Sequence, residues 1–346
     1  MFLKIKIRIE RELGNYARNI NKIYPLQEIS PVLSKNIKEF ICRKGKRIRP
    51  VLFCIGYLGF SKQTPPGLYR SALSLELLHN CLLVHDDIID KSCLRRGKPS
   101  MHSLLNSYLR QNKKTKFSGE DLAIAVGDVI YAMALDVFLE VKENLRRKED
   151  ALKKLILAAL YTGSGEFSEL LLGTKSLEKV TRKDIYKIYD YKTANYTFAS
   201  PLTMGATLAG AKTSQIKKLY AYGILLGRAF QIKDDIIGIF AQEKETGKSN
   251  ITDILEAKRT LLIWYAYSKT SKKDKLKIER ILQAKSVKNT ELKEIRKIIV
   301  ESGALIYAQN QIRYLYAKAL NQITGLKMNK KYKQALDEFS QKVLEV

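Results

Sequence analysis

Hydrophobic residues recur along most of the chain at intervals of three and four, the spacing of one helix face. The clearest stretches are Ser71–Lys91, Ala123–Glu140, Ala151–Tyr161 and Ile216–Phe240. No stretch shows the alternating pattern and tight turns of a sheet. Turn-forming residues interrupt the pattern near Thr64–Gly67, Arg95–Pro99, Gln111–Gly119 and Glu243–Asn250, and none of these breaks resembles a domain linker. We therefore expect an all-α fold, organised as a single domain over residues 1–346.

Two of the predicted helices are hydrophobic on all sides, over Leu73–Ile89 and Tyr222–Phe240. Helices of this kind lie in the middle of a bundle. A third stretch, Thr193–Ala211, contains no charged residue but holds an asparagine, a proline and two glycines. We interpret it as a buried segment rather than a membrane span.

Each of the two apolar helices ends in an acidic cluster. In the first cluster Asp86 and Asp90 share one helix face, about 6 Å apart along the axis. Facing carboxylates repel each other and are costly at the end of a buried helix unless a cation bridges them. Carboxylate ligands without histidine or cysteine favour a hard cation, and magnesium if phosphates complete the coordination.

The second cluster contains Asp234 and Asp235 and repeats this design far downstream. One acidic pair at a helix end is often only a solvated cap. Two matching clusters, each closing an apolar helix, instead indicate a site that holds several metal ions inside a bundle.

The formal net charge of +27 arises from 62 lysines and arginines against 35 acidic residues, spread along the whole chain. This charge indicates either an anionic partner or a lysine-rich solvated surface. The four cysteines have no CxxC spacing, which predicts a reducing cytoplasmic environment with neither a disulfide framework nor structural zinc. The first residues lack the apolar stretch of a signal peptide.

Basic residues flank both acidic clusters and complete a predicted diphosphate site. They occur in Gly45–Pro50, which reads GKRIRP, in the pair Arg95-Arg96, at Lys192 and at Lys248. Arginine binds phosphate oxygens in a bidentate manner, and lysine acts as a point charge. Any one of these side chains alone is more often an ordinary surface charge. Their position around the aspartates makes the functional interpretation the stronger one.

Together these motifs resemble the trans-polyprenyl diphosphate synthases. GKRIRP, HNCLLVHDDIID, RRGKP, KT, FQIKDD and GKSNITDILEAKRTLL occur in the family's order, over about residues 40–265, with 266–346 left as C-terminal helices. The resemblance implies an isoprenoid-synthase-type helical bundle around a deep central cavity, usually a homodimer. It also implies condensation of isopentenyl diphosphate with an allylic diphosphate, assisted by three Mg²⁺ ions, to give a longer all-trans prenyl diphosphate and diphosphate.

The resemblance assigns roles to individual residues. The implied metal ligands are Asp86, Asp90 and Asp234. The implied allylic diphosphate contacts are Arg95, Lys192, Thr193, Gln231, Lys248 and Lys258, among which Lys192, Thr193 and Gln231 are also the implied catalytic residues. The implied isopentenyl diphosphate contacts are Lys46, Arg49, His79, Arg96 and Phe230. The second motif departs from the family at Gly238, where aspartate is usual, and we expect activity to survive this change.

In this family the residues before the first aspartate motif line the tunnel that receives the growing product. Ser74, Leu78 and Cys81 share one helix face, and Leu82 lies beside it. Cys81 is small, and the motif contains no insertion. We therefore expect a product of twenty carbons or longer, unless Cys81 only packs in the core.

Two other readings remain open at this point. A class I terpene cyclase also uses an aspartate-rich motif, but it has a different second motif and needs no second diphosphate site. A catalytically silent partner, or a basic helical protein that binds nucleic acid or membranes, would be expected to have lost an aspartate or Lys192. We expect no nucleic-acid partner, no transmembrane segment, and only transient membrane contact for long products.

Overall fold

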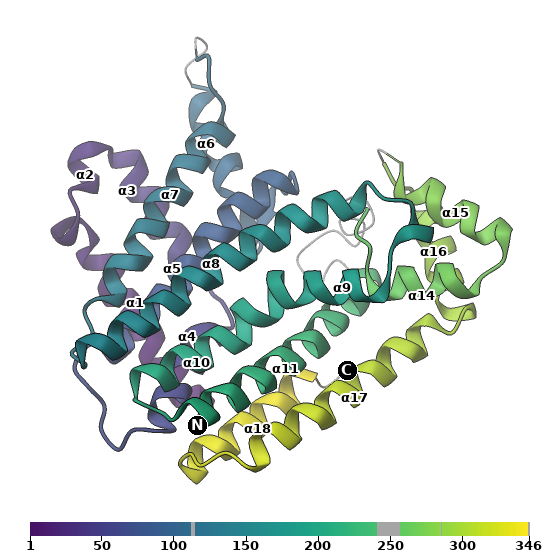
Figure 1. The fold of residues 1–346 in the computed structure, drawn as a ribbon. Coiled ribbons are helices and arrows are strands. Elements are labelled where there is room, and N and C mark those ends of the chain that lie inside the picture. The colour runs from purple at the N-terminus through teal and green to yellow at the C-terminus, as the bar shows by residue number, and fades with distance from the viewer. Residues whose placement is uncertain (112–114, 241–256, 285, 345–346) are drawn as a thin grey trace. The chain divides into compact units, whose positions relative to one another are not determined.

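The chain folds almost entirely as α-helices, which confirms the predicted fold class. This computed structural model describes residues 1–346 except 112–114, 241–256, 285 and 345–346 (Figure 1). Within the described residues the only strands are β1 (Leu94–Arg95) and β2 (Lys98–Pro99), which pair antiparallel. This short hairpin falls where the sequence predicted only a break.

The described residues form two compact units, Met1–Leu155 with Met204–Ala211 (unit 1) and Ile156–Thr203 with Lys212–Val346 (unit 2). The division falls inside two helices, α8 (Leu145–Gly173) and α10 (Ser200–Leu208). Organisation as a single domain therefore stays a prediction.

Unit 1 is built around one buried helix, α5 (Leu68–Ile89), which contacts five other helices. These are α1 (Phe2–Ile23), α3 (Pro31–Ile41), α4 (Ile48–Leu58), α6 (Met101–Leu109) and α7 (Gly119–Phe138). A short α2 (Leu26–Ile29) precedes α3. Because every residue from 71 to 78 is buried, over more than two turns, the helix has no solvent face over this stretch. Its predicted central position is confirmed.

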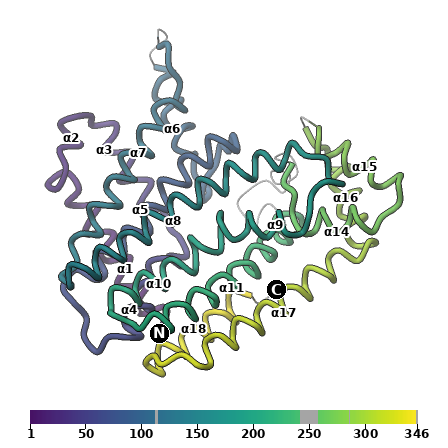
Figure 2. The backbone as a smooth tube through the Cα atoms, in the orientation of Figure 1, coloured from purple at the N-terminus to yellow at the C-terminus, as the bar shows by residue number. Residues whose placement is uncertain are grey.

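Unit 2 is built around α11 (Thr213–Phe240), which lies beside α17 (Ala304–Thr324) in Figure 2. It also contacts α14 (Leu261–Lys269), α18 (Lys330–Leu344) and the π-helix η2 (Tyr189–Ala199). The remaining elements are η1 (Leu177–Lys179), α9 (Arg182–Ile188), α15 (Lys272–Leu282) and α16 (Asn289–Glu301).

Helix η2 and α11 approach each other closely because two glycines on α11 lack side chains. A Cβ on Gly227 would lie 2.4 Å from Cα of Ala194, and a Cβ on Gly223 would lie 2.5 Å from Cα of Ala199. Residues 194–206 are all buried, which confirms the predicted burial of most of the uncharged stretch.

One described helix, α8, is long and apolar enough to cross a membrane by length and composition alone. Only 28% of its most apolar window is buried inside the molecule.

We expect Gly227→Ala to lower the free energy of unfolding by about 1–3 kcal/mol, because the added methyl group would collide with the backbone of η2. The matched control is Gly163→Ala on α8, where an added Cβ meets no atom within 4 Å. That change should raise the free energy of unfolding by about 0.5–1 kcal/mol through helix propensity. Urea denaturation measures both. Equal effects for the two variants would contradict the close-packing explanation.

Candidate functional site

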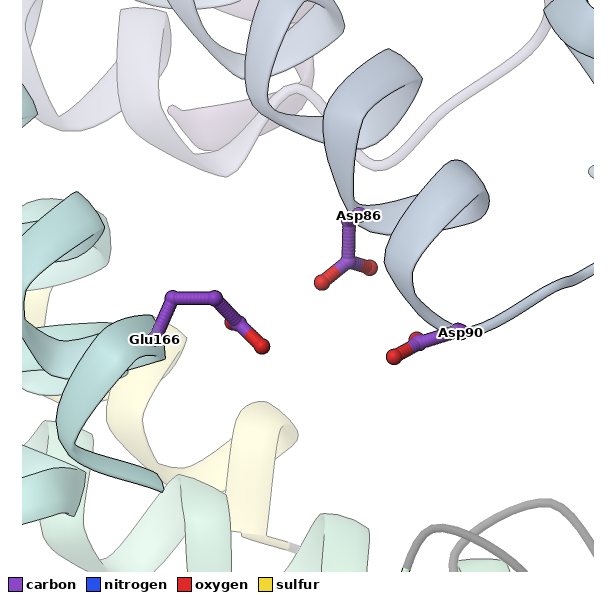
Figure 3. Close-up of side chains that lie close together, drawn as sticks. All are labelled: Asp86, Asp90 and Glu166. Carbon is purple, nitrogen blue, oxygen red and sulfur yellow. The ribbon is translucent and has the colours of Figure 1, made fainter. Parts of the chain in front are cut away.

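The first aspartate cluster lies at the C-terminal end of α5 in unit 1. Carboxylate oxygens of Asp86 and Asp90 lie within 4.8 Å of each other, and both side chains are half-buried. Figure 3 shows the two carboxylates on the same side of the last turn, as the four-residue spacing predicts. Two hard oxygen donors on one side of a helix suit a hard cation such as magnesium. Among the described residues of unit 1, no histidine or cysteine is grouped with them as a ligand.

The middle aspartate of the motif has a different role. Asp87 is fully buried, and its Oδ1 accepts a hydrogen bond of 2.7 Å from Nε of Arg95. Arg95 also lies 3.3 Å from Asp86 and is only 6% exposed. Burial opposes the charge of Arg95, but the hydrogen bond and charge of Asp87 outweigh this effect and raise its pKa. Arg95 thus anchors the aspartate motif, and its predicted contact with the allylic substrate stays a prediction.

A second group of cations surrounds His79 on α5. The pKa of His79 lies well below its usual value. Burial is the largest cause, followed by the charges of four arginines, which in decreasing order of effect are Arg49, Arg96, Arg95 and Arg47. His79 is therefore a neutral imidazole near neutral pH and can donate or accept a hydrogen bond without adding charge. Lys46, another member of the predicted isopentenyl diphosphate group, is exposed.

Arg96 is placed by the β1–β2 hairpin. Its register pairs Leu94 with Pro99 and Arg95 with Lys98, which leaves Arg96 and Gly97 as the two turn residues. Both have positive φ, of 56° and 72°, as the common two-residue hairpin turn requires. The sequence RRGKP therefore forms a rigid turn that presents two successive arginines.

The second aspartate cluster belongs to a hydrogen-bonded chain in unit 2. Oγ1 of Thr193 donates to Oε1 of Gln231 (2.6 Å), and Nε2 of Gln231 donates to Oδ1 of Asp235 (2.8 Å). The hydroxyl of Tyr189 donates to the other oxygen of Asp235 and accepts from the backbone N–H of Leu261 (2.9 Å). Each member fixes the orientation of the next.

Asp235 is therefore a structural carboxylate, and only 5% of it is exposed. Its neighbour Asp234, the predicted metal ligand, is half-buried on α11. The sequence alone did not show that the two aspartates would differ in this way, nor did it single out Tyr189.

Lys192 lies in the π-helix next to Thr193 and pairs with Glu166 and Glu169 of α8. Figure 3 also labels Glu166 on this helix. Close approach at this point depends on Gly165, because a Cβ there would lie 2.8 Å from the backbone nitrogen of Lys192. The pairing with two glutamates was not predicted.

Other predicted residues occupy varied positions. The ring of Phe230 packs edge-on against Phe198, with centroids 5.3 Å apart, and Lys258 is half-buried. Lys248 lies outside the described residues. On α5, the proposed chain-length residues Ser74, Leu78 and Cys81 are at most 4% exposed, and Leu82 is half-buried.

We expect Tyr189→Phe to lower the free energy of unfolding by about 1–3 kcal/mol, because a buried carboxylate and a buried N–H would each lose a partner. Tyr186→Phe is the control, since its hydroxyl makes one part-buried bond of 3.2 Å, to Gln311. That change should cost less than about 1 kcal/mol. Chemical denaturation of both variants checks the ranking, and a larger effect at Tyr186 would contradict it.

Comparison with known proteins identifies this arrangement. The family model of polyprenyl synthetases matches residues 30–299. The chain is 30% identical to geranylgeranyl diphosphate synthase of Saccharolobus solfataricus, over 86% of this chain and 85% of that protein. It is 31% identical to geranylfarnesyl diphosphate synthase of Aeropyrum pernix, over 80% of this chain and 81% of that protein.

A solved structure agrees with these relatives. Geranylgeranyl pyrophosphate synthase from Corynebacterium glutamicum, complexed with isoprenyl diphosphate and magnesium, is 25% identical with a TM-score of 0.88. The similarity covers 99% of this chain and 98% of that one. The chain therefore belongs to the polyprenyl synthetase family, which confirms the enzyme class predicted from its motifs.

Proposed function

We propose that this enzyme condenses isopentenyl diphosphate with an allylic diphosphate to give an all-trans prenyl diphosphate of twenty carbons or longer. The observation that carries the proposal is the facing pair Asp86 and Asp90 on α5, in a chain of this family. Asp86 and Asp90, and separately Asp234, would hold Mg²⁺. The bound ions, three in the complete complex, would neutralise the diphosphate that leaves the allylic carbon.

The allylic carbon–oxygen bond breaks first, and the diphosphate leaves with the electron pair. Cationic side chains, of which Lys192 is one, hold the diphosphate as its charge increases. Glu166 and Glu169 keep the Lys192 ammonium in place. Arg95, Lys248 and Lys258 complete the proposed allylic contacts.

The allylic cation would be stabilised by the dipoles of nearby polar groups that are held in place. Thr193 is suited to this role because its hydroxyl proton is donated to Gln231, which leaves the oxygen lone pairs as acceptors. Gln231 is in turn held by Asp235, so neither side chain reorients easily. The double bond of isopentenyl diphosphate then attacks the cation. The new cation loses a proton, which the released diphosphate can accept.

The second substrate is held in this proposal by Lys46, Arg49, His79 and Arg96, with Phe230 packed against it. A neutral His79 suits the role because it contributes a hydrogen bond to a site that already contains several arginines. The cytoplasmic location expected from the sequence belongs to the same proposal.

We also propose that the enzyme works as a homodimer. An apolar row on the second half of α8 supports this, since Ile156, Leu160, Phe167 and Leu171 are 42–65% exposed and share one helix face. A row of this kind is typical of a surface that another protein covers.

A magnesium-dependent diphosphate-release assay with isopentenyl diphosphate and each allylic primer tests the reaction. We expect Asp86→Ala and Asp90→Ala to lower turnover by at least a hundredfold, because each removes a metal ligand. Thermal stability without metal should change little, since the two carboxylates repel each other. Near-normal turnover of either variant at saturating magnesium would refute the metal assignment.

Product length is tested at Cys81, which is 4% exposed and lies about 7 Å along α5 from Asp86. Cys81→Phe should shorten the product, because the ring would fill the space that the growing chain needs. Leu83→Phe is the control, since this half-buried position lies on the opposite side of α5. Chromatography of the dephosphorylated products decides, and a wild-type product of fifteen carbons would refute the proposed length.

A further inference from the structure

One buried carboxylate in unit 1 has no role in the reaction as described so far. Glu76 on α5 is 2% exposed, and its Oε1 accepts a hydrogen bond from Nη1 of Arg47. The same oxygen lies 3.5 Å from Nη2 of Arg96. A buried carboxylate is costly unless it is paired, so these contacts are a built part of the unit.

Both arginines are held in an unusual backbone conformation. Arg47 has φ of 54° and Arg96 has φ of 56°, in the left-handed region that side chains rarely adopt. Residues in this conformation persist where the surrounding structure fixes them. Here two of them, from segments on either side of α5 in the sequence, converge on one carboxylate.

The backbone of residues 43–45 forms the other side of this arrangement. The carbonyl oxygen of Arg43 accepts from Nη2 of Arg47 (2.6 Å) and from Nη1 of Arg96 (3.1 Å). A Cβ on Gly45 would lie 3.3 Å from a terminal nitrogen of each guanidinium. The two planar groups are therefore held between a glycine backbone and Glu76, and a side chain at position 45 would have to displace them by a few tenths of an ångström.

The two arginines are not held equally. Arg47 also lies 3.0 Å from Glu10, and its side chain has no exposed surface. Arg96 lies farther from Glu76, at 3.5 Å, is also held by the Arg43 carbonyl oxygen, and has 18% of its side chain exposed. Burial lowers the pKa of Arg96, and Glu76 is the charge that most opposes this effect. Arg47 is thus fully enclosed by its partners, whereas part of the Arg96 side chain is accessible to a ligand.

We propose that Glu76 is a positioning residue for the diphosphate of isopentenyl diphosphate, acting through Arg96 and braced by Arg47 and the Gly45 backbone. This inference rests on the proposed function, in which Arg96 contacts that substrate. Its physical basis is that one negative charge among several arginines offsets their mutual repulsion and aims Arg96 before the substrate binds.

The test is Glu76→Gln, which keeps the shape of the side chain and removes its charge. We expect the KM for isopentenyl diphosphate to rise about tenfold, with kcat and the KM for the allylic substrate changed less than about twofold. If the Glu76 carboxylate acted only by repelling the diphosphate, its removal in Glu76→Gln would lower the KM for isopentenyl diphosphate. A fall in the KM for isopentenyl diphosphate would therefore overturn the proposal.

A double-mutant cycle tests whether Glu76 acts through Arg96. If it does, adding Glu76→Gln to Arg96→Gln should raise the KM for isopentenyl diphosphate no further, whereas independent action would give additive effects. Glu143→Gln is the matched control, because Glu143 is largely buried and pairs with Arg147 at 3.0 Å, beside Tyr57 at the far end of α4. It should leave the KM for isopentenyl diphosphate unchanged.

If Glu76→Gln does not fold, Gly45→Ala tests the same point without a change of charge. The added methyl group presses on both guanidiniums and should raise the same KM selectively. An equal rise in KM for isopentenyl diphosphate and for the allylic substrate, or no rise in either KM, would overturn the proposal. Calorimetric binding of isopentenyl diphosphate gives the same comparison without turnover. An inactive wild type whose binding is weakened by Glu76→Gln would therefore count against the proposed function and not against the role of Glu76.

Discussion

Buried charge must be paired within the protein, and this constraint organises the site-bearing end of unit 1. Helix α5 carries three carboxylates, Glu76, Asp86 and Asp87, on an otherwise largely apolar helix, and Asp90 caps its C-terminal end. Arg47 pairs with Glu76, and Arg95 pairs with Asp87. These pairs make the arginine-rich loops permanent parts of the unit, since breaking either would leave a buried charge without its partner.

Unit 2 reaches the same rigidity with mostly neutral groups. Asp235 accepts hydrogen bonds from the Gln231 amide and the Tyr189 phenol, and these two groups accept in turn from the Thr193 hydroxyl and the backbone N–H of Leu261. Under the proposed function, the fixed dipoles of Thr193 and Gln231 would stabilise the allylic cation, while Lys192 in the same unit would hold the departing diphosphate.

The sequence predicted what depends on periodicity and spacing. The central helices, the shared face of Asp86 and Asp90, and the burial of the uncharged stretch all follow from counting residues along a helix. Partners distant in sequence could not be counted in this way. Arg47 meets Glu76 across 29 residues and Tyr189 meets Asp235 across 46, so the roles of Glu76, Asp87 and Tyr189 required the folded chain. The hairpin at Arg95–Lys98 was missed because two-residue strands leave no alternating pattern.

The π-helix η2 determines which direction the side chains before and after it face. Its wider turns run from Tyr189 to Ala199, and its residues Ala194 and Ala199 meet Gly227 and Gly223. Removing one residue from this segment would rotate everything that follows by about 100° relative to what precedes it. Lys192 and Thr193 would then no longer face their partners while the two alanines faced the glycines. The wider winding of this segment thus lets Lys192 face its glutamates on α8 while Thr193 and the two alanines face α11.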